Sequence, residues 1–384
     1  MRRVALHTPA GIDVLELDVA KASIVSEGVL AAMVAHLELE RRAGGYEAAR
    51  QAAPALETAR HRLAHLARIP GARVEFVGNG SDAVRMLVEA WPLEPGDAVL
   101  VPRSEFLSNR LAVQRLAGVR GIDVVELAED GTGRLDPATV ETALRGRRVG
   151  LVVLSHVASQ RGVVQPVGEV LEITAAAGVP VLVDVCQSLG HVPAVPGAAA
   201  IAGTSRKWLH GPRGIGFVAV DPAWWERLDA PATLHSRLGT GTDVRADPAV
   251  ALFEAPEASV AGRVGLATAV GELLEAGPEQ VAATLAGKGR QLREVLAERA
   301  AGLSLGEPVD EPSAIVTIHP VEDGVATAVV AALDAAGVRA GVVPAGRAVD
   351  TTRDVVRLAP APWVPDDGLV RAAEVVAAAL SAVP

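Results

Sequence analysis

Short apolar runs alternate with helical segments between residues 73 and 220 of this 384-residue chain. The runs are rich in Val, Leu and Ile, a pattern typical of strands that helices cover on both faces of a parallel sheet. They lie at 73–77, 97–101, 122–127, 149–154, 179–184, 199–204 and 214–220. Helical segments fall between most of them, for example at 81–89, 137–144 and 166–177. The alternation therefore predicts an α/β fold.

The segments that flank this block complete the predicted organisation. Residues 26–43 have helical periodicity, with Ser26 as a candidate N-cap, and a second helix covers about 48–69. Beyond residue 250 we expect helices at 262–275, 278–300, 324–336 and 366–382, separated by apolar runs at 313–319, 338–343 and 354–359. We therefore divide the chain into an N-terminal segment (1–20) that packs on the small domain, a large α/β domain (21–250) and a small C-terminal α+β domain (251–384).

The composition argues against several classes of partner. Lys and Arg number 36 and Asp and Glu 46, and the resulting net charge of −10 disfavours nucleic acid or a membrane surface. The N-terminus lacks the apolar core of a signal peptide, and no 18-residue apolar run without charges occurs, so we expect a soluble, cytoplasmic protein. The single cysteine, Cys186, excludes an intramolecular disulfide and a thiolate metal cluster, and we expect no metal site.

One lysine stands out in the stretch "GTSRKWLHGPRGIGF" (203–217). The chain has only three lysines, Lys21, Lys207 and Lys288, against 33 arginines. An arginine cannot give up its proton, whereas a lysine amine can do so and can form a Schiff base. A lysine taken alone is more often a surface residue, so a chemical role for Lys207 depends on its neighbours.

Two other motifs are candidates for those neighbours. Asp184 ends the apolar run of "VPVLVDVCQSLG", and ligands bind at this edge of open α/β sheets. A carboxylate there can hold a pyridinium nitrogen protonated, or it can simply cap a turn. Three residues later, Gln187 could bond a substituent of the same ring. In "EFVGNGSDAVRML", the N–H groups of Gly80 and Ser81 at a helix start can bind one phosphate.

The order "FVGNGSDA … VLVDVCQSLG … GTSRKWLHGPRGIGF" resembles the class-V aminotransferase family, pyridoxal-phosphate enzymes of fold type I that include the cysteine desulfurases. The resemblance covers nearly the whole chain. It implies a mostly parallel central sheet with helices on both faces, a smaller C-terminal domain, and pyridoxal 5'-phosphate as cofactor. Shared active sites in a homodimer are implied as well.

The same resemblance implies roles for individual residues. Lys207 would link covalently to the cofactor and move protons, Asp184 would pair with the ring nitrogen, and Gln187 would bond the phenolic oxygen. The phosphate would face Gly80, Ser81 and Ser205. Phe106, in "SEFLSN", would stack on the cofactor face where the desulfurases have a histidine. Arg357, in "VVRLAP", would clamp the substrate carboxylate with its guanidinium fork.

The single cysteine bears on the reaction. A desulfurase needs a reactive cysteine on a mobile loop, whereas Cys186 lies just past a strand end as a small filler. The segments 154–167, 203–214 and 253–269 resemble the hercynylcysteine sulfoxide lyases. That narrower resemblance implies a carbon–sulfur lyase that acts on a cysteine sulfoxide by β-elimination and yields ergothioneine through a sulfenic acid, with pyruvate and ammonia. The alternatives are an aminotransferase or desulfurase-like lyase acting on another amino acid, or a non-catalytic member of the fold.

Three further residues are candidates for substrate binding. Glu257 stands where the family commonly has a phosphate-binding threonine from the partner subunit. Its charge would repel a phosphate, so we expect it to face the cationic hercynyl group or, alternatively, solvent. The segment 254–263 would then reach the partner's site. Gln160 and Arg161 follow Ser159, which replaces a common asparagine, and they would either line the active site or form a plain loop.

Overall fold

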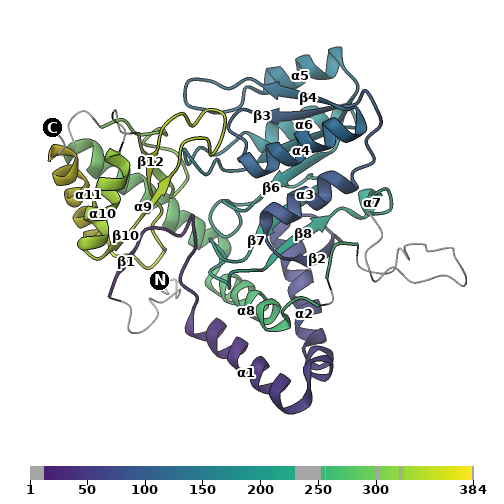
Figure 1. The fold of residues 1–384 in the computed structure, drawn as a ribbon, viewed down its shortest axis with the longest axis horizontal. Coiled ribbons are helices and arrows are strands. Elements are labelled where there is room, and N and C mark those ends of the chain that lie inside the picture. Colours follow the sequence, from purple (N-terminus) through teal and green to yellow (C-terminus); the bar gives the residue numbers. More distant parts are fainter. Residues whose placement is uncertain are drawn as a thin grey trace, which may run out of the picture.

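The computed structural model describes residues 13–229, 252–255, 257–299, 303–319, 322 and 324–382, and a seven-stranded sheet forms its centre (Figure 1). The strands follow the order β2-β8-β7-β6-β5-β3-β4. All neighbours pair in parallel except β8, which runs antiparallel to both β2 and β7. The strands are β2 (Arg73–Val77), β3 (Ala98–Pro102), β4 (Asp123–Leu127), β5 (Val149–Ser155), β6 (Val181–Asp184), β7 (Ala200–Thr204) and β8 (Gly216–Val220). The predicted α/β fold is confirmed.

Helices cover both faces of this sheet, which explains why its strands are apolar throughout. In β3, Val99 and Val101 join one hydrophobic core while Leu100 joins the other. The first core holds α3 (Gly80–Ala90) and α4 (Leu107–Arg120), and the second holds α5 (Pro137–Gly146) and α6 (Val167–Ala176). The short α7 (Pro222–Trp225) follows β8.

Three further helices pack beside the large sheet. In α1 (Glu27–Ala43), the Ser26 hydroxyl accepts the Val29 N–H at 3.0 Å, so the predicted N-cap is confirmed. The helices α2 (Gly45–Ala67) and α8 (Val260–Ala276) pack against α1 and against each other. Figure 1 shows α1 projecting from the body of the molecule.

A smaller antiparallel sheet of order β11-β12-β9 lies to one side of the large one (Figure 1). It consists of β9 (Val316–Ile318), β11 (Gly341–Val343) and β12 (Val355–Leu358), with α9 (Pro278–Arg299), α10 (Val325–Ala335) and α11 (Asp366–Ser381) around it. The N-terminal strand β1 (Leu15–Glu16) pairs in parallel with β10 (Val338–Arg339).

The division into three parts remains a proposal. The β1–β10 pairing supports an N-terminal segment that packs on the small domain. Because α8 packs on α1 and α2 whereas α9 packs on α11, we place the passage between the two domains at Gly277, later than residue 250. No helix in the described ranges is long and apolar enough to cross a membrane.

Candidate active site

A cavity of about 270 Å³ opens where several strands of the large sheet end. Asp184 ends β6, Thr204 ends β7 and Ser155 ends β5, while Gly78 follows β2. Its lining consists of Gly78, Asn79, Gly80, Ser81, Phe106, Ser155, Val157, Ser159, Asp184, Cys186, Gln187, Thr204, Arg206, Lys207, Arg213 and Gly214. The three motifs singled out in the sequence therefore meet in one cavity.

Lys207 is the one lysine in this lining. Burial lowers the pKa of its amine to about 8, and the nearby charges of Arg206 and Arg357 act in the same direction, against that of Asp184. An amine with such a pKa is partly neutral near pH 7, and a neutral amine can act as a nucleophile and as a base.

Asp184 and Cys186 both line the cavity and interact with each other. Asp184 is buried, and its Oδ1 accepts the backbone N–H of Cys186 at 2.8 Å. Burial raises the pKa of the Cys186 thiol well above its ordinary value, and the charge of Asp184 adds to the effect. The only thiol of the chain is therefore a poor nucleophile.

One end of the cavity is suited to an anion. Gly80 and Ser81 supply first-turn N–H groups of α3, which lack intrahelical partners, and the helix dipole favours negative charge there. The guanidinium groups of Arg206 and Arg213 belong to the same lining. Ser205 does not: it is fully buried, and its unpartnered hydroxyl lies against Gly211. Thr204 lines the cavity instead.

Phe106 and Gln187 both line the cavity as predicted. The Arg347 guanidinium lies over the Phe106 ring, 5.4 Å from its centroid. The Gln187 amide already bonds within the chain, because its nitrogen donates to the Ala20 carbonyl at 3.0 Å and its oxygen accepts from Trp208 Nε1 at 2.9 Å. Among the described residues, one N–H and one lone pair of the Gln187 amide have no partner, so they are available to a ligand.

The predicted carboxylate clamp, Arg357, lies beside the cavity and outside its lining. Its Nη1 donates to the Ser159 carbonyl at 3.1 Å, and its Nη2 lies 3.5 Å from Asp18 Oδ1. Burial lowers its pKa from the ordinary arginine value. Its Nε is buried without a partner among the described residues, so this N–H is available to a substrate.

The remaining predicted residues lie outside the cavity lining. Gln160 donates to the Ser104 carbonyl at 2.9 Å and to Asp350 at 3.2 Å. Arg161 pairs with the same Asp350 at 2.6 Å. Glu257 is exposed, and one of its oxygens lies 3.5 Å from the Tyr46 hydroxyl. Their substrate-binding roles stay predictions.

Sequence reasoning missed two buried polar residues behind the cavity. Asn109 donates to Asp184 Oδ2 at 2.7 Å and to Glu105 Oε1 at 2.8 Å. Burial raises the pKa of Glu105 to about 7, and the charge of Asp184 adds to the rise. Asn109 and Glu105 both belong to the polar segment "SEFLSN", which follows the buried strand β3. This position could have indicated them, but only Phe106 was predicted there.

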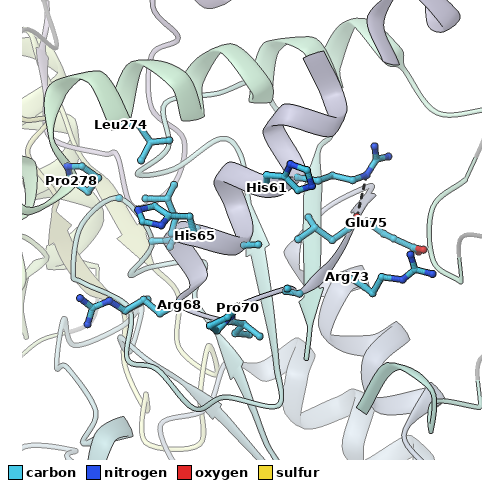
Figure 2. Close-up of a pocket in the computed structure, with 18 of the residues that line it drawn as sticks. His61, His65, Arg68, Pro70, Arg73, Glu75, Leu274 and Pro278 are labelled. Carbon is cyan, nitrogen blue, oxygen red and sulfur yellow. Dashed lines mark hydrogen bonds between the residues drawn. The ribbon is translucent and has the colours of Figure 1, made fainter. Parts of the chain in front are cut away.

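A larger hollow of about 1780 Å³ lies elsewhere and shares no residue with the cavity. Figure 2 shows its wall, with His61 and His65 from α2 on one side and Arg73 and Glu75 from β2 on another. It contains neither a lysine nor a cysteine, so we assign the chemistry to the smaller cavity. No group of three or more potential metal ligands occurs among the residues described.

Comparisons with known proteins show the family to which the chain belongs. The model of the aminotransferase class-V family matches residues 17–358. A probable hercynylcysteine sulfoxide lyase of Mycobacterium tuberculosis (strain CDC 1551 / Oshkosh) is 36% identical over 381 residues, which cover 93% of this chain and 88% of that protein. A probable cysteine desulfurase of Methanothermobacter thermautotrophicus is 32% identical over 235 residues, covering 59% and 58%.

Solved structures share the fold. The apo cysteine desulfurase of Thermococcus onnurineus NA1 has a TM-score of 0.84 at 20% identity, and a cysteine desulfurase of Escherichia coli has a TM-score of 0.82 at 19% identity. Each comparison covers 96% of this chain and 95% of the other. At these identities the likeness establishes the arrangement of the sheet and helices, and the chemistry must be argued from the cavity.

Proposed function

Because the chain belongs to the class-V aminotransferase family and is a pyridoxal-phosphate-dependent carbon–sulfur lyase, we propose that it cleaves S-(hercyn-2-yl)-L-cysteine S-oxide. The products are the sulfenic acid of ergothioneine, pyruvate and ammonia, and a reductant outside the protein then converts the sulfenic acid to the thiol. The observation that carries the proposal is a cavity with a lysine of lowered pKa and without a reactive thiol.

The residues of the cavity fit pyridoxal phosphate. Gly80, Ser81, Arg206 and Arg213 would hold its phosphate, and Thr204 would add a hydroxyl. Asp184, at the strand end, would hold the proton on the ring nitrogen. When bound, the cofactor supplies an electron sink that stabilises negative charge on the substrate Cα.

The chain's own groups then carry out an elimination. Lys207 Nζ, neutral in part because burial lowers its pKa to about 8, takes the proton from Cα. The Cβ–S bond breaks and its electron pair leaves with sulfur as the sulfenate. One water molecule hydrolyses the remaining enamine to pyruvate and ammonia. Arg357 would orient the substrate through its carboxylate, using the guanidinium nitrogen that has no partner in the described chain.

The state of Cys186 favours elimination over sulfur transfer to the enzyme. A persulfide-forming desulfurase needs a thiolate, and burial keeps the pKa of Cys186 well above its usual range. Its sulfur also packs against the phosphate-binding turn at Gly80. The chain has no second cysteine to take the role.

Recognition of the hercynyl cation is proposed to involve a second subunit. A fixed trimethylammonium charge is costly to bury without a carboxylate or an aromatic face. Glu257 and Tyr46, the only tyrosine of the chain, lie together on the surface, where Tyr46 is 87% exposed. We propose that this pair completes the active site of the partner subunit.

The projecting helix α1 supports a homodimer. Leu30, Val34 and Leu37 recur at helical spacing, and each is at least half exposed. Exposed apolar rows of this kind mark interaction surfaces. We propose a cytoplasmic homodimer, in keeping with an unpaired cysteine that would not need an oxidising compartment.

The decisive experiment is incubation of the holoenzyme with S-(hercyn-2-yl)-L-cysteine S-oxide and a thiol reductant. Mass spectrometry should detect ergothioneine, and a coupled assay should detect one pyruvate for each ergothioneine. The Lys207→Ala protein should produce neither. Pyruvate from other cysteine derivatives with no cleavage of this substrate would reject the substrate, and alanine in place of pyruvate would reject elimination.

A further inference from the structure

A single side-chain amide bridges two buried carboxylates behind the cavity. The Asn109 nitrogen donates to Asp184 Oδ2 at 2.7 Å and to Glu105 Oε1 at 2.8 Å, so both of its hydrogens are used. Asn109 and Glu105 are each 1% exposed. If the amide were flipped, its oxygen would face two carboxylates and could accept no hydrogen bond from either. The amide nitrogen must therefore point toward Asp184 and Glu105.

Glu105 is held from two elements at once. Its Oε1 also accepts the Phe106 N–H at 2.9 Å and the Ser155 hydroxyl at 2.5 Å, while Oε2 accepts the Ser155 N–H at 2.6 Å. Ser155 ends β5 and Asn109 lies in the first turn of α4, so the carboxylate joins the helix to the sheet edge. Four donors favour the charged form of this carboxylate. Because burial raises the pKa of Glu105 to about 7, the charged form predominates above that pH.

The charges around this pair leave it with a net negative charge. Glu105 forms no ion pair within the described ranges, and Asp184 is the nearby charge that acts on it. Asn109 and Ser155 are neutral, and burial lowers the pKa of the neighbouring His156 to about 4. Cys186 stays protonated, and Lys207 lines the same cavity, where its positive charge interacts with the negative charge of Asp184.

We propose that Glu105 is a positioning residue that acts on Asp184 through Asn109. It fixes the orientation of the Asp184 carboxylate toward the cavity and places a second negative charge behind it. That charge would raise the proton affinity of the group that Asp184 contacts. In the bound cofactor this group would be the ring nitrogen of pyridoxal phosphate. The inference depends on the cofactor and not on the proposed substrate, so a different substrate would leave it intact.

The variants separate charge from packing. Glu105→Gln removes the charge at nearly constant shape, whereas Glu105→Asp keeps the charge but withdraws the carboxylate from its donors. Glu129→Gln is the matched control, because Glu129 accepts the Ser104 N–H at 2.6 Å in the same turn and burial also raises its pKa, yet it has no bond to Asn109 or Asp184. Ser155→Ala removes one donor and should weaken the charged form of Glu105.

The readout is the nitrogen-15 chemical shift of ring-labelled pyridoxal phosphate in the holoenzyme, followed from pH 6 to 10. The Glu105→Gln protein should lose the ring proton at a lower pH than the wild type, by about one unit or less, because Glu105 acts from behind Asn109 and Asp184. The ring nitrogen of the Glu129→Gln holoenzyme should titrate as in the wild type. That of Glu105→Asp should shift by less than in Glu105→Gln, because this variant keeps the charge although it loses donors. In Ser155→Ala the ring nitrogen should lose its proton at a lower pH than in the wild type, by a smaller shift than in Glu105→Gln. This variant tests the proposal if Glu105→Gln fails to fold.

Thermal unfolding and the dissociation constant of the cofactor complete the experiment. Equal shifts in Glu105→Gln and Glu105→Asp would overturn the proposal, because they would trace the effect to packing. A lower unfolding temperature of Glu105→Gln with an unchanged titration would overturn it too.

Discussion

The Cys186 sulfur fills the space beside Gly80: a Cβ atom added to Gly80 would lie 2.2 Å from Sγ. The next nearest atom, Thr204 Cβ, would be 3.5 Å away, which is an ordinary contact. Residue 80 therefore has to lack a side chain because residue 186 carries a sulfur. The turn at Gly80, which is proposed to bind the phosphate, and the thiol after β6 are therefore matched in size.

Gly80→Ala should weaken both the fold and cofactor binding, since overpacking a filled site costs about 1–3 kcal/mol. Cys186→Ala combined with Gly80→Ala should recover most of that loss, because the colliding atom is gone. Thermal unfolding and fluorescence titration with pyridoxal phosphate measure the two effects. Additive losses in the double variant would contradict the steric explanation.

Cys186→Ala alone should retain most carbon–sulfur cleavage, because the thiol has no role in elimination. A small loss of stability is expected from the vacated volume. The rate of pyruvate release and the unfolding temperature report on the two separately. A folded, cofactor-loaded variant without activity would restore a thiol mechanism.

Covalent attachment of pyridoxal phosphate to the apoprotein should depend on pH through Lys207. Burial lowers the pKa of this amine to about 8, so the neutral fraction, and with it the attachment rate, should rise about tenfold for each pH unit below that value and level off above it. Stopped-flow absorbance follows the rate. After borohydride reduction, peptide mass mapping should place the cofactor on Lys207, and Lys288→Gln should behave as wild type. Attachment to Lys21 would reject the assignment.

Glu257→Gln and Tyr46→Ala should raise KM for the hercynyl substrate and change KM for a simple alkyl cysteine sulfoxide much less. Only the first substrate carries the fixed cation that these side chains are proposed to contact. Glu279→Gln, which alters a carboxylate on the wall of the larger hollow, is the matched control for net charge. Equal losses on both substrates would point to a structural role for the pair.

The sequence predicted the large sheet well because its strands are buried on both faces. Val99 and Leu100 enter different cores, so an unbroken apolar run is the expected pattern. The same pattern could not reveal that β8 runs antiparallel to its neighbours, since a central strand is equally apolar in either direction. The direction of β8 follows from the loop 205–215, which returns the chain so that Gly216 pairs with Thr204, and this return is a tertiary property.

The cavity was predicted less completely, for two physical reasons. Neighbouring residues at the end of a strand point in opposite directions. Thr204 therefore lines the cavity whereas Ser205 is buried outside its lining, and the sequence alone did not distinguish the two. Partners far apart in sequence also cannot be paired by inspection. Asn109 meets Asp184 75 residues later, and Arg161 meets Asp350 189 residues later.

The protonated state of Cys186 has a consequence for the conditions under which the chain can work. Peroxides and alkylating agents attack thiolates far faster than thiols, and burial holds the pKa of this thiol well above its usual range. An elimination carried by a lysine and a carboxylate therefore does not depend on an oxidisable thiolate. The proposed elimination should therefore continue under oxidising conditions that inactivate enzymes dependent on a thiolate.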